Sequence, residues 1–512
     1  MVRNPRAQVR NFPLVLSWFL ALCGLLSAQA SGVTVVVNTV NDFSSDCAAT
    51  GTGLCSLRDA INFSNSHAQL AGPSLIAFNI PGSGVQTISL VAPLPQITAA
   101  VVIDGYSQPG ASPNALDVGN DAVLLVQVLG GIEVAGGVTL LGGSTIKGLV
   151  ISEITLTSCC NAVSGNFVGL DPTGTVLLGG GGIVVSSSRN VIGGTTPQDR
   201  NALTSRGGSG VVSLLADENQ VSGNYIGTNA AGTAAFYDPV LGSRIGAPGV
   251  YITGSSNTVG GSSPSARNVI SGNTDGVVLD GAARPPGSFP AGNIVAGNFI
   301  GTDATGTVAI LNFGAPGLAY GGVFVGNNVL GTSLSAGDVG NVIDYPYNGF
   351  GVSVTDCLDG NSVFFNTMHP FSASIPLVPI GPGIQRCSPG FPTPPVLTHA
   401  SLGSRLEIHG TLSGHPNRTF RIQVFSNHSS LAKALCAQAN PFGTTGEIFL
   451  GDTMVTTNAQ GAFQASFKIR AGGLPFGNPV TATATEANSN DTSQFSNCRS
   501  VVGELQPVAQ AQ

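Results

Sequence analysis

A motif of 11 residues occurs three times in this chain, and it constrains the fold more than any other feature. Each copy begins with Gly-Asn, an aromatic residue, an aliphatic residue and Gly, and ends in Gly-Thr. A shorter motif that starts with Asn alternates with it. Short apolar segments that recur between Gly and Asn are typical of repeat proteins. The long motif spans residues 165–175, 223–233 and 297–307, and the short one begins at Asn190, Asn257 and Asn328, each followed by a further Asn at Asn201, Asn268 and Asn341.

Each unit reads as a short strand between two turns, because Val, Ile and Phe favour strands while Gly and Asn adopt the positive φ of tight turns. No helical pattern of about ten residues separates the strands, and two-residue hairpin turns are missing too. A chain that winds the same way on every turn satisfies both limits. We therefore predict an all-β fold: a right-handed parallel β-helix followed by a small Ig-like β-sandwich.

The predicted helix has room for about ten to fourteen coils of about 20–25 residues between residues 75 and 366. Its aliphatic side chains should stack inside as ladders, with about 4.8 Å between coils. Asn at corresponding turns is expected to hydrogen-bond from coil to coil. Residues 236–248 and 282–290 interrupt the pattern and read as loops that leave the helix.

Composition agrees with this fold and excludes other classes. Of 512 residues, 71 are Gly, and only 9% are charged, where about 25% is usual. The net charge of −7 and the lack of a basic patch exclude a nucleic-acid partner. An apolar share of 42% excludes disorder. Stacked coils would place like charges about 4.8 Å apart, so a solenoid favours neutral Ser, Thr and Asn.

The first 30 residues read as a signal peptide, so we expect a secreted or cell-surface protein. Three arginines precede an apolar run at residues 14–26, and Ala28-Gln29-Ala30 forms a cleavage site. Lipidation at Cys23 is the alternative, which the bulky Leu22 disfavours. No second long apolar run follows, so we expect no transmembrane segment in the mature chain.

Cysteine usage predicts disulfides in the exported chain. Eight cysteines remain after removal of the signal peptide, an even number. Cys159 and Cys160 are adjacent, and either a vicinal disulfide or two thiols would fit. A metal site is disfavoured, because no histidine lies between His67 and His369. The expected pairs, from spacing, are Cys47 with Cys55, Cys357 with Cys387, and Cys436 with Cys498.

The chain divides into six predicted parts. Ser56 and Asp59 read as an N-cap and its partner in a short helix that covers the first coil. After a stretch rich in proline, alternating strands return and fit a sandwich, with Phe425, Phe467 and Phe495 in its core. The parts are a signal peptide (1–30), an N-terminal cap (31–74), the β-helix (75–369), a linker (370–395), the Ig-like sandwich (396–502) and a tail (503–512).

The cap contains a motif that indicates a family. Residues 55–60, Cys-Ser-Leu-Arg-Asp-Ala, resemble the CSLREA motif near the start of bacterial exported β-helix proteins, with Asp59 in place of Glu. Residues 103–110, Ile-Asp-Gly-Tyr-Ser-Gln-Pro-Gly, are similar to that group too. The resemblance covers about residues 33–366 and implies the architecture of the pectin-lyase-like superfamily. It implies no particular activity, because the group shares none.

Four residues are candidates for binding. Asp171, Asn229 and Asp303 recur at one position of the long motif, where they could line a calcium or sugar site. The alternative is an Asx-turn, which Gly three residues later and the exchange of Asp for Asn both favour. Asp275 lies in Asn-Thr-Asp-Gly, one signature of polygalacturonase-type hydrolases, but the other signatures are missing.

Two hypotheses about function follow. We expect a non-catalytic protein without a cofactor that is structural, adhesive or carbohydrate-binding, with polysaccharide or cell-envelope material as its partner. The alternative is a polysaccharide lyase or glycoside hydrolase with an unrecognised site. A lyase would need a basic residue beside calcium-binding carboxylates. No such cluster surrounds the arginines of the cap and the repeats, namely Arg58, Arg189, Arg200 and Arg267.

Overall fold

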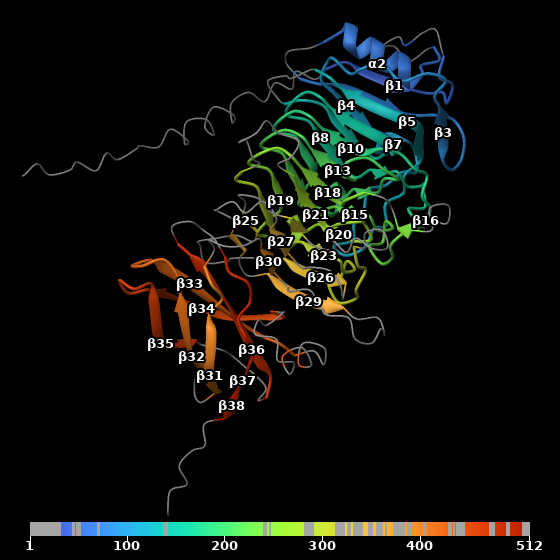
Figure 1. Cartoon of the computed structure of the whole chain (residues 1–512). Helices are drawn as coiled ribbons and strands as arrows, with labels where there is room; N and C mark the ends of the chain where they lie inside the picture. Colours follow the sequence, from blue (N-terminus) through green and yellow to red (C-terminus); the bar gives the residue numbers. More distant parts are fainter. Residues whose placement is uncertain are drawn as a thin grey trace, which may run out of the picture.

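The computed structural model shows a long stack of parallel coils with a separate sandwich after it (Figure 1). The expected signal peptide, the loop at 282–290, the Cys357–Cys387 pair and Asn328 lie outside the described residues. Described are residues 32–312 apart from 44–46, 48–52, 69–71, 137–141, 239–242, 245–246 and 281–290; strand segments between 323 and 386; and residues 392–503 apart from 403–405, 429–432, 434–435, 437–445, 470–476 and 488–491.

The first sheet of the β-helix has 11 parallel strands, which follow one another in chain order. One strand comes from each coil, so the count falls within the expected number of coils. In order, the strands are β1 (Thr34–Val37), β2 (Ser74–Phe78), β4 (Val101–Asp104), β6 (Thr145–Lys147), β8 (Ala162–Ser164), β11 (Val191–Gly193), β14 (Gln220–Ser222), β19 (Thr258–Gly260), β22 (Ile294–Ala296), β25 (Val329–Leu330) and β28 (Ser362–Val363).

Two further parallel sheets complete each coil, and the long strands β5 (Val126–Val134) and β7 (Val150–Leu156) bend from one into the other. The second sheet continues from their first halves with β3 (Gln86–Ser89), β9 (Phe167–Val168), β12 (Ala202–Leu203), β15 (Tyr225–Ile226), β20 (Val269–Ile270), β23 (Phe299–Ile300), β26 (Val342–Pro346) and β29 (Thr367–Phe371). The third continues from their second halves with β10 (Gly182–Val185), β13 (Val212–Leu214), β18 (Val250–Ile252), β21 (Val277–Leu279), β24 (Val323–Phe324), β27 (Val352–Val354) and β30 (Ile384–Arg386).

These pairings confirm the parallel β-helix, and the right-handed sense of winding stays a prediction. The expected coil length was too short, since steps between equivalent residues of neighbouring coils range from 23 to 44 residues in the repeats. Unequal loops between the strands account for the difference. One of them carries the antiparallel pair β16 (Tyr237–Asp238) and β17 (Ser243–Arg244), inside the expected loop at 236–248. Strand β30 pairs with β27, so parallel pairing continues into the expected linker at 370–395.

Aliphatic ladders fill the interior of the coils. On the second sheet, each inward side chain is paired in register with the next and is at most 1% exposed. Each such column removes a continuous strip of apolar surface from water, the dominant favourable contribution to folding. The column runs through Ile88, Val128, Ile151, Val168, Leu203, Ile226, Ile270, Ile300 and Ile343.

A ladder of buried asparagines forms the corner before the first sheet. The backbone N–H and the side-chain Nδ2 of Asn190 both donate to Oδ1 of Asn219, at 2.8 and 3.2 Å. Asn161 and Asn257 make the same pair of bonds to the next coil. Every member is at most 2% exposed. The ladder consists of Asn161, Asn190, Asn219, Asn257 and Asn293.

A second asparagine ladder forms the corner before the second sheet. It contains the Asn of every long motif, such as Asn224, and also the Asn that follows each short motif, such as Asn268. The two kinds of repeat thus place their asparagines at one corner on alternate coils, which sequence spacing did not reveal. The members are Asn166, Asn201, Asn224, Asn268, Asn298, Asn341 and Asn366.

Left-handed backbone recurs directly before the first ladder. Five residues in this column have φ between +57° and +69°, and four of them carry a side chain. A non-glycine residue in this region is strained. The stacked corner holds it there, because the Asn that follows is bonded to both neighbouring coils. The column is Cys160, Arg189, Glu218, Ser256 and Gly292.

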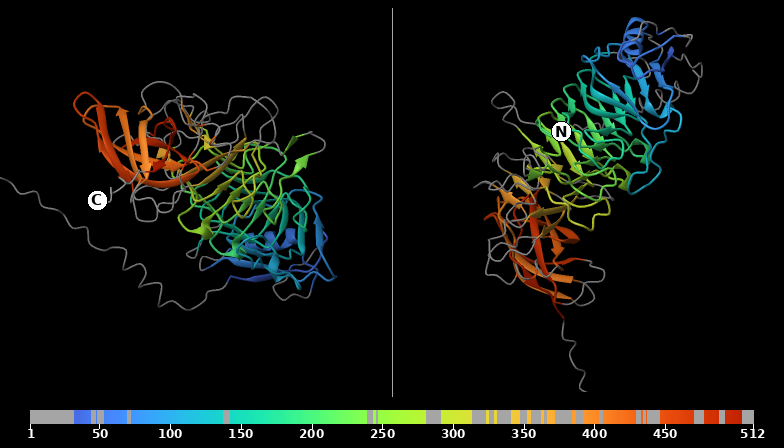
Figure 2. Two further views of the ribbon diagram at one scale, coloured as in Figure 1. Left: turned by 90° about the horizontal axis from the view of Figure 1, so that it is seen from below. Right: turned by 90° about the vertical axis from the view of Figure 1, so that its right-hand side faces the viewer.

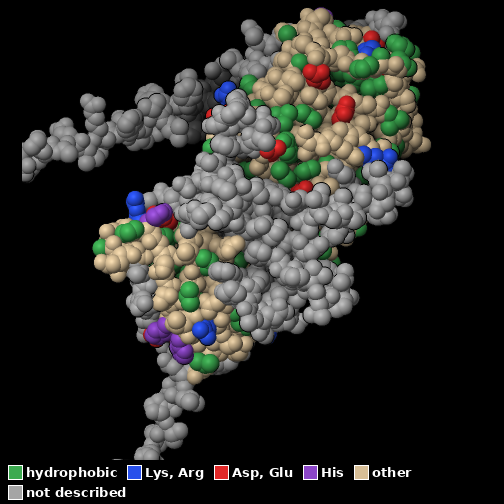
Figure 3. Space-filling view, in the orientation of Figure 1, with side chains coloured by type: hydrophobic (Ala, Val, Ile, Leu, Met, Phe, Trp, Pro, Cys, Tyr) green, Lys and Arg blue, Asp and Glu red, His purple; other side chains and the backbone are tan. Residues whose placement is uncertain are grey.

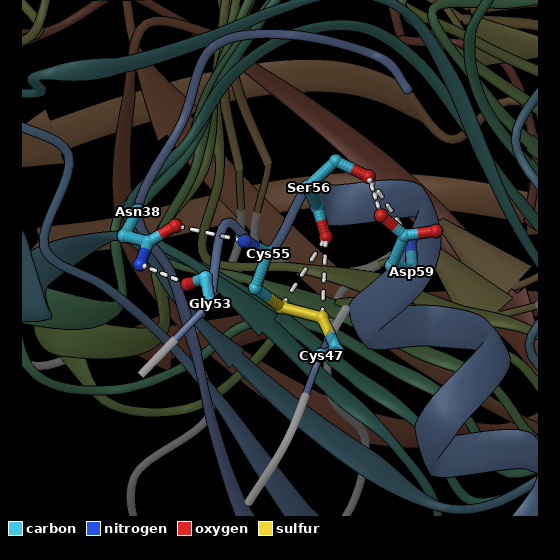
Figure 4. Close-up of a disulfide and its surroundings, with 6 residues drawn as sticks. All are labelled: Asn38, Cys47, Gly53, Cys55, Ser56 and Asp59. Atoms are coloured by element: carbon cyan, nitrogen blue, oxygen red, sulfur yellow. Dashed lines mark hydrogen bonds between the residues drawn. A yellow bond between two sulfur atoms is a disulfide. The ribbon is translucent and has the colours of Figure 1, made fainter. Parts of the chain in front are cut away.

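The cap motif has a structural role, and Figure 4 shows its residues Cys55, Ser56 and Asp59. Cys55 forms the expected disulfide with Cys47, and Ser56 accepts a hydrogen bond from the backbone of Asp59 as N-cap of α2 (Leu57–Ser66). Leu57 and Ala60 are buried against the first coil. The side chain of Arg58 contacts Asp42 at 2.7 Å and carbonyl groups of residues 92 and 93. The motif therefore closes the N-terminal end of the helix core.

The second motif of the resemblance joins neighbouring coils. Gln108 is 2% exposed and bonds both the N–H and the carbonyl of Ile80. The Tyr106 hydroxyl donates to the Gly165 carbonyl at 2.6 Å, and a Cβ at Gly165 would lie 2.6 Å from that hydroxyl oxygen. Glycine is therefore required at this corner.

The C-terminal part is a sandwich of two four-stranded sheets. Phe425 and Phe495 are buried, but they belong to the apolar cluster of the β-helix core and not, as expected, to that of the sandwich. The sandwich therefore covers the C-terminal end of the coils (Figure 2). The side chain of Phe467 lies outside the described residues, and the Cys436–Cys498 disulfide is confirmed. The strands, in sheet order, are β35 (Ala462–Ile469), β32 (Leu406–Ser413), β31 (Val396–Leu402) and β38 (Val502–Gly503), then β34 (Ile448–Thr456), β33 (Thr419–Ser426), β36 (Pro479–Glu486) and β37 (Arg499–Ser500).

Replacing the central asparagine of the first ladder should destabilise the β-helix strongly. Asn219→Ala removes the acceptor for the buried N–H of Asn190, and we expect a loss of about 3 kcal/mol of unfolding free energy. Urea unfolding measures this loss. Asn62→Ala, at an exposed position of α2, is the control and should change stability by less than about 0.5 kcal/mol. Equal effects of the two changes would contradict a structural role for the ladder.

Relief of backbone strain should stabilise the fold. Ser256 is exposed with φ +57°, so Ser256→Gly is expected to raise the unfolding free energy by up to about 1 kcal/mol. Ser262 is also exposed but does not have positive φ. Thermal unfolding of Ser262→Gly should therefore show no gain, and a gain of the same size there would count against the strain at Ser256.

Candidate binding cleft

The outer face of the second sheet carries a column of aromatic residues. Phe167, Tyr225 and Phe299 lie on alternate coils, and small aliphatic residues, Ala202 and Val269, lie between them. Phe167 and Tyr225 are each 3% exposed, although they point away from the helix core. Something outside the coil must therefore cover these rings.

The cover is the second half of each long motif. The three loops stack on one another, because the N–H of Ala230 donates to the Gly174 carbonyl and that of Ala304 to the Gly232 carbonyl, each at 2.9 Å. Gly174 and Gly232 have positive φ, and a Cβ on either would collide with the alanine above it. Glycine at this position of the motif is thus needed for both reasons.

Asp171, Asn229 and Asp303 hold these loops in shape. In each, Oδ1 accepts hydrogen bonds from the backbone N–H groups four and five residues later, at 2.8 to 3.2 Å. Burial raises the pKa of Asp171 and Asp303, but hydrogen bonds from the hydroxyl groups of Thr173 and Thr305 and from the backbone N–H groups outweigh it, so the pKa of both is lowered. Oxygens used in this way are less available to calcium, and a ligand-binding role for the three residues stays a prediction.

Arg200 and Arg267 occupy equivalent places between the aromatic rings. Each follows a short 3-10 helix, η2 (Pro197–Asp199) or η3 (Pro264–Ala266), and directly precedes an asparagine of the second ladder. The guanidinium of Arg200 lies 4.7 Å from the centre of the Tyr225 ring, and that of Arg267 lies 4.1 Å from the centre of the Phe299 ring. Cation–π contact stabilises both arrangements.

The two arginines differ in what their terminal nitrogens bind. Nη1 and Nη2 of Arg200 donate to carbonyl groups of Leu116, Asp117 and Gly119, at 2.6 to 2.8 Å. Those residues belong to a loop from an earlier coil, which also bonds the Tyr225 hydroxyl. Arg267 donates through Nε to the Gly297 carbonyl at 3.0 Å, and its Nη1 and Nη2 have no partner among the described residues.

A cleft of about 340 Å³ lies between these two arginines. This volume is at the lower end of the range for small-ligand sites. One wall comes from the earlier loop, with Asp117 and Val118, and Arg200 and Arg267 supply the two guanidinium groups. Hydroxyl groups come from Thr195, Thr196 and Ser265, and apolar surface from Pro197, Pro264, Val269 and Ala304 around the Tyr225 ring.

Asp275 lies apart from the cleft, at the corner between β20 and β21. Burial raises its pKa to about 6, against the hydrogen bond from Thr274. Its Oδ1 is buried without a hydrogen-bond partner within the described part of the chain. None of the four candidate residues, Asp171, Asn229, Asp303 and Asp275, is among the lining residues of the cleft.

Other chemistry is sparse over the described residues. They hold no cluster of three or more potential metal ligands, and none of their helices is long and apolar enough to cross a membrane. Charged side chains are few and scattered on the visible β-helix face, and the histidines in view lie on the sandwich (Figure 3). Cys159 and Cys160 are free thiols whose Sγ atoms are 2.6 Å apart.

Comparisons with known proteins do not assign the chain to a family. No family model matches the chain, and no curated protein matches it. The tailspike protein of E. coli bacteriophage HK620 with a pentasaccharide is 11% identical at a TM-score of 0.30, over 88% of this chain and 92% of that one. A variant of that tailspike with a hexasaccharide has 10% identity, the same TM-score and the same coverage. Such values support no conclusion about this chain, and its fold rests on the strand pairings above.

From the sequence, both arginines were considered only as possible bases of a lyase, and the cleft was not predicted. Their equivalence could have been recognised from the sequence, because each arginine directly precedes the asparagine that follows a short motif. The loop around residues 116–119 could not be placed, because it meets Arg200 from more than 80 residues away in sequence.

The shifted carboxyl groups predict opposite pH dependence. Burial disfavours the charged form of Asp275 and raises its pKa to about 6. The folded state is therefore compatible with the neutral carboxyl at low pH and loses stability as the pH rises through about 6 and the carboxyl ionises. Asp275→Asn should therefore be more stable than the wild type at pH 7.5, and the difference should vanish near pH 4. The lowered pKa of Asp303 has the opposite sign, so its contribution disappears on acidification.

Urea unfolding of both variants at several pH values distinguishes these cases. Asp303→Asn is the matched comparison, because Asn229 shows that the same turn forms with Asn. A wild-type advantage over Asp275→Asn at pH 7.5 would contradict the raised pKa.

Proposed function

We propose that this chain is a non-catalytic β-helix protein that binds carbohydrate in the cleft between Arg200 and Arg267. The observation that carries the proposal is the cleft itself, which combines planar guanidinium groups, hydroxyl groups and apolar surface. Sugars present hydroxyl groups at their edges and C–H groups on their faces, so a small mixed site of this kind suits them.

The carboxylates favour binding over hydrolysis. Among the described residues that line the cleft, only Asp117 is acidic. A glycosidase needs a pair of carboxyl groups, and a lyase of the calcium-dependent type needs several beside a base. The alternative function, a polysaccharide lyase or hydrolase, would therefore depend on another part of the chain.

We also propose that the chain is exported, with residues 1–30 as its signal peptide, and that its sandwich is an Ig-like module. The disulfides Cys47–Cys55 and Cys436–Cys498 support an oxidising compartment. Two packed sheets of mainly antiparallel strands, with β31 and β38 parallel, support an Ig-like arrangement.

Filling the cleft should abolish binding. Ser265 is an exposed lining residue, and Ser265→Trp would occupy space that a sugar ring needs. Affinity electrophoresis in gels with neutral and acidic polysaccharides measures retardation of the mature chain. We expect retardation by at least one polysaccharide, and a loss of about tenfold or more in affinity for the variant.

Ser262→Trp is the matched control, because Ser262 is exposed and does not line the cleft. Retardation that survives Ser265→Trp would contradict binding in this cleft. Release of new reducing ends or unsaturated products from the same polysaccharides would instead support the enzymatic alternative.

A further inference from the structure

We infer that the cleft takes the carboxylate group of an acidic sugar, and that Nη1 and Nη2 of Arg267 bind it. This inference rests on the proposed function. It starts from the internal repeat, in which Arg200 and Arg267 are equivalent. Each follows a short 3-10 helix, precedes an asparagine of the second ladder and lies over an aromatic ring.

The contacts of Arg200 show which groups the terminal nitrogens of an arginine at this position of the repeat bind. The loop of residues 116–119 supplies three carbonyl oxygens to its two terminal nitrogens. No described loop supplies the equivalent oxygens to Arg267, which lines the cleft together with Arg200. A ligand that completes the repeat at Arg267 must therefore present oxygen acceptors in place of those carbonyls.

The chemistry of a guanidinium selects the kind of oxygen. A carboxylate presents two acceptors in the plane of the guanidinium fork, and such charge-assisted, bidentate pairs are about twice as strong as neutral hydrogen bonds. The guanidinium is half-buried over the Phe299 ring, and no described carboxylate forms an ion pair with it. Arg267 therefore holds an uncompensated charge that an anionic ligand would pair.

The rest of the cleft suits a sugar that carries this group. Thr195, Thr196 and Ser265 offer hydroxyl groups. The apolar surface of Pro197 and Pro264 is available to the face of a ring. Asp117 lies on the side of Arg200, where its charge would repel a second carboxylate. The geometry thus favours one carboxylate at Arg267 for each bound segment.

The test compares a galacturonate hexamer with the fully methyl-esterified hexamer, which has the same rings but no charge. Isothermal titration calorimetry of the mature chain should show the acid binding about tenfold or more tightly than the ester. Arg267→Gln should reduce binding of the acid to the level of the ester, and Arg267→Lys should retain part of the preference. Circular dichroism of both variants verifies that they fold.

Arg189→Gln is the charge-matched control, because Arg189 is 66% exposed and lies at the other corner of the coil. It should leave the preference unchanged. Equal affinity for acid and ester, or a preference that survives Arg267→Gln, would overturn this inference and leave carbohydrate binding intact. Tight binding of a sulfated galactan without binding of the galacturonate would overturn the carboxylate assignment. Failure of every glycan to bind would contradict the proposed function as well.

Discussion

Hydrogen bonds between buried asparagines fix the register of the coils, and the rest of the β-helix depends on them. Several strands of the second sheet, such as β9, β12 and β15, contain two residues each, so strand pairing alone contributes few hydrogen bonds per coil. At the corners, Oδ1 atoms such as those of Asn219 and Asn268 accept from the backbone of the neighbouring coil. A slip by one residue would leave these buried groups unpaired and would turn the aliphatic ladders outward.

The candidate site is a consequence of this register. Because Asn201 and Asn268 share one ladder, Arg200 and Arg267 are presented at the same corner, two coils apart. The aromatic rings recur on the alternate coils, so that each arginine lies over the ring of the coil that follows it, and the glycine-containing loops of the long motif cover those rings. The loop of residues 116–119 reaches one arginine and not the other. A cleft therefore opens where the repeat loses its cover, without any special catalytic segment.

The features that depend on local residue chemistry could be predicted from the sequence. Gly, Asn and short apolar runs were sufficient for the parallel coils and for coil-to-coil bonding by Asn, and cysteine spacing was sufficient for two disulfides. The coil length was underestimated, because loops of unequal length separate the strands. The two motifs were treated as different turns, since only strand register shows that Asn224 and Asn268 share a corner. The cleft depends on contacts between distant segments, and nothing near Arg267 in sequence indicates that its donors are unpaired.

Hydrogen–deuterium exchange of the native chain, resolved by residue, tests the dependence on the ladders most directly. If the corners hold the coils, the backbone N–H groups of Asn190, Asn219 and Asn268 exchange only through global unfolding, as slowly as the amides of β5, the longest described strand of the β-helix. Their exchange should then follow the unfolding free energy when urea is added. Exchange of these groups at the rate of exposed turn amides, while the strands stay protected, would contradict the account.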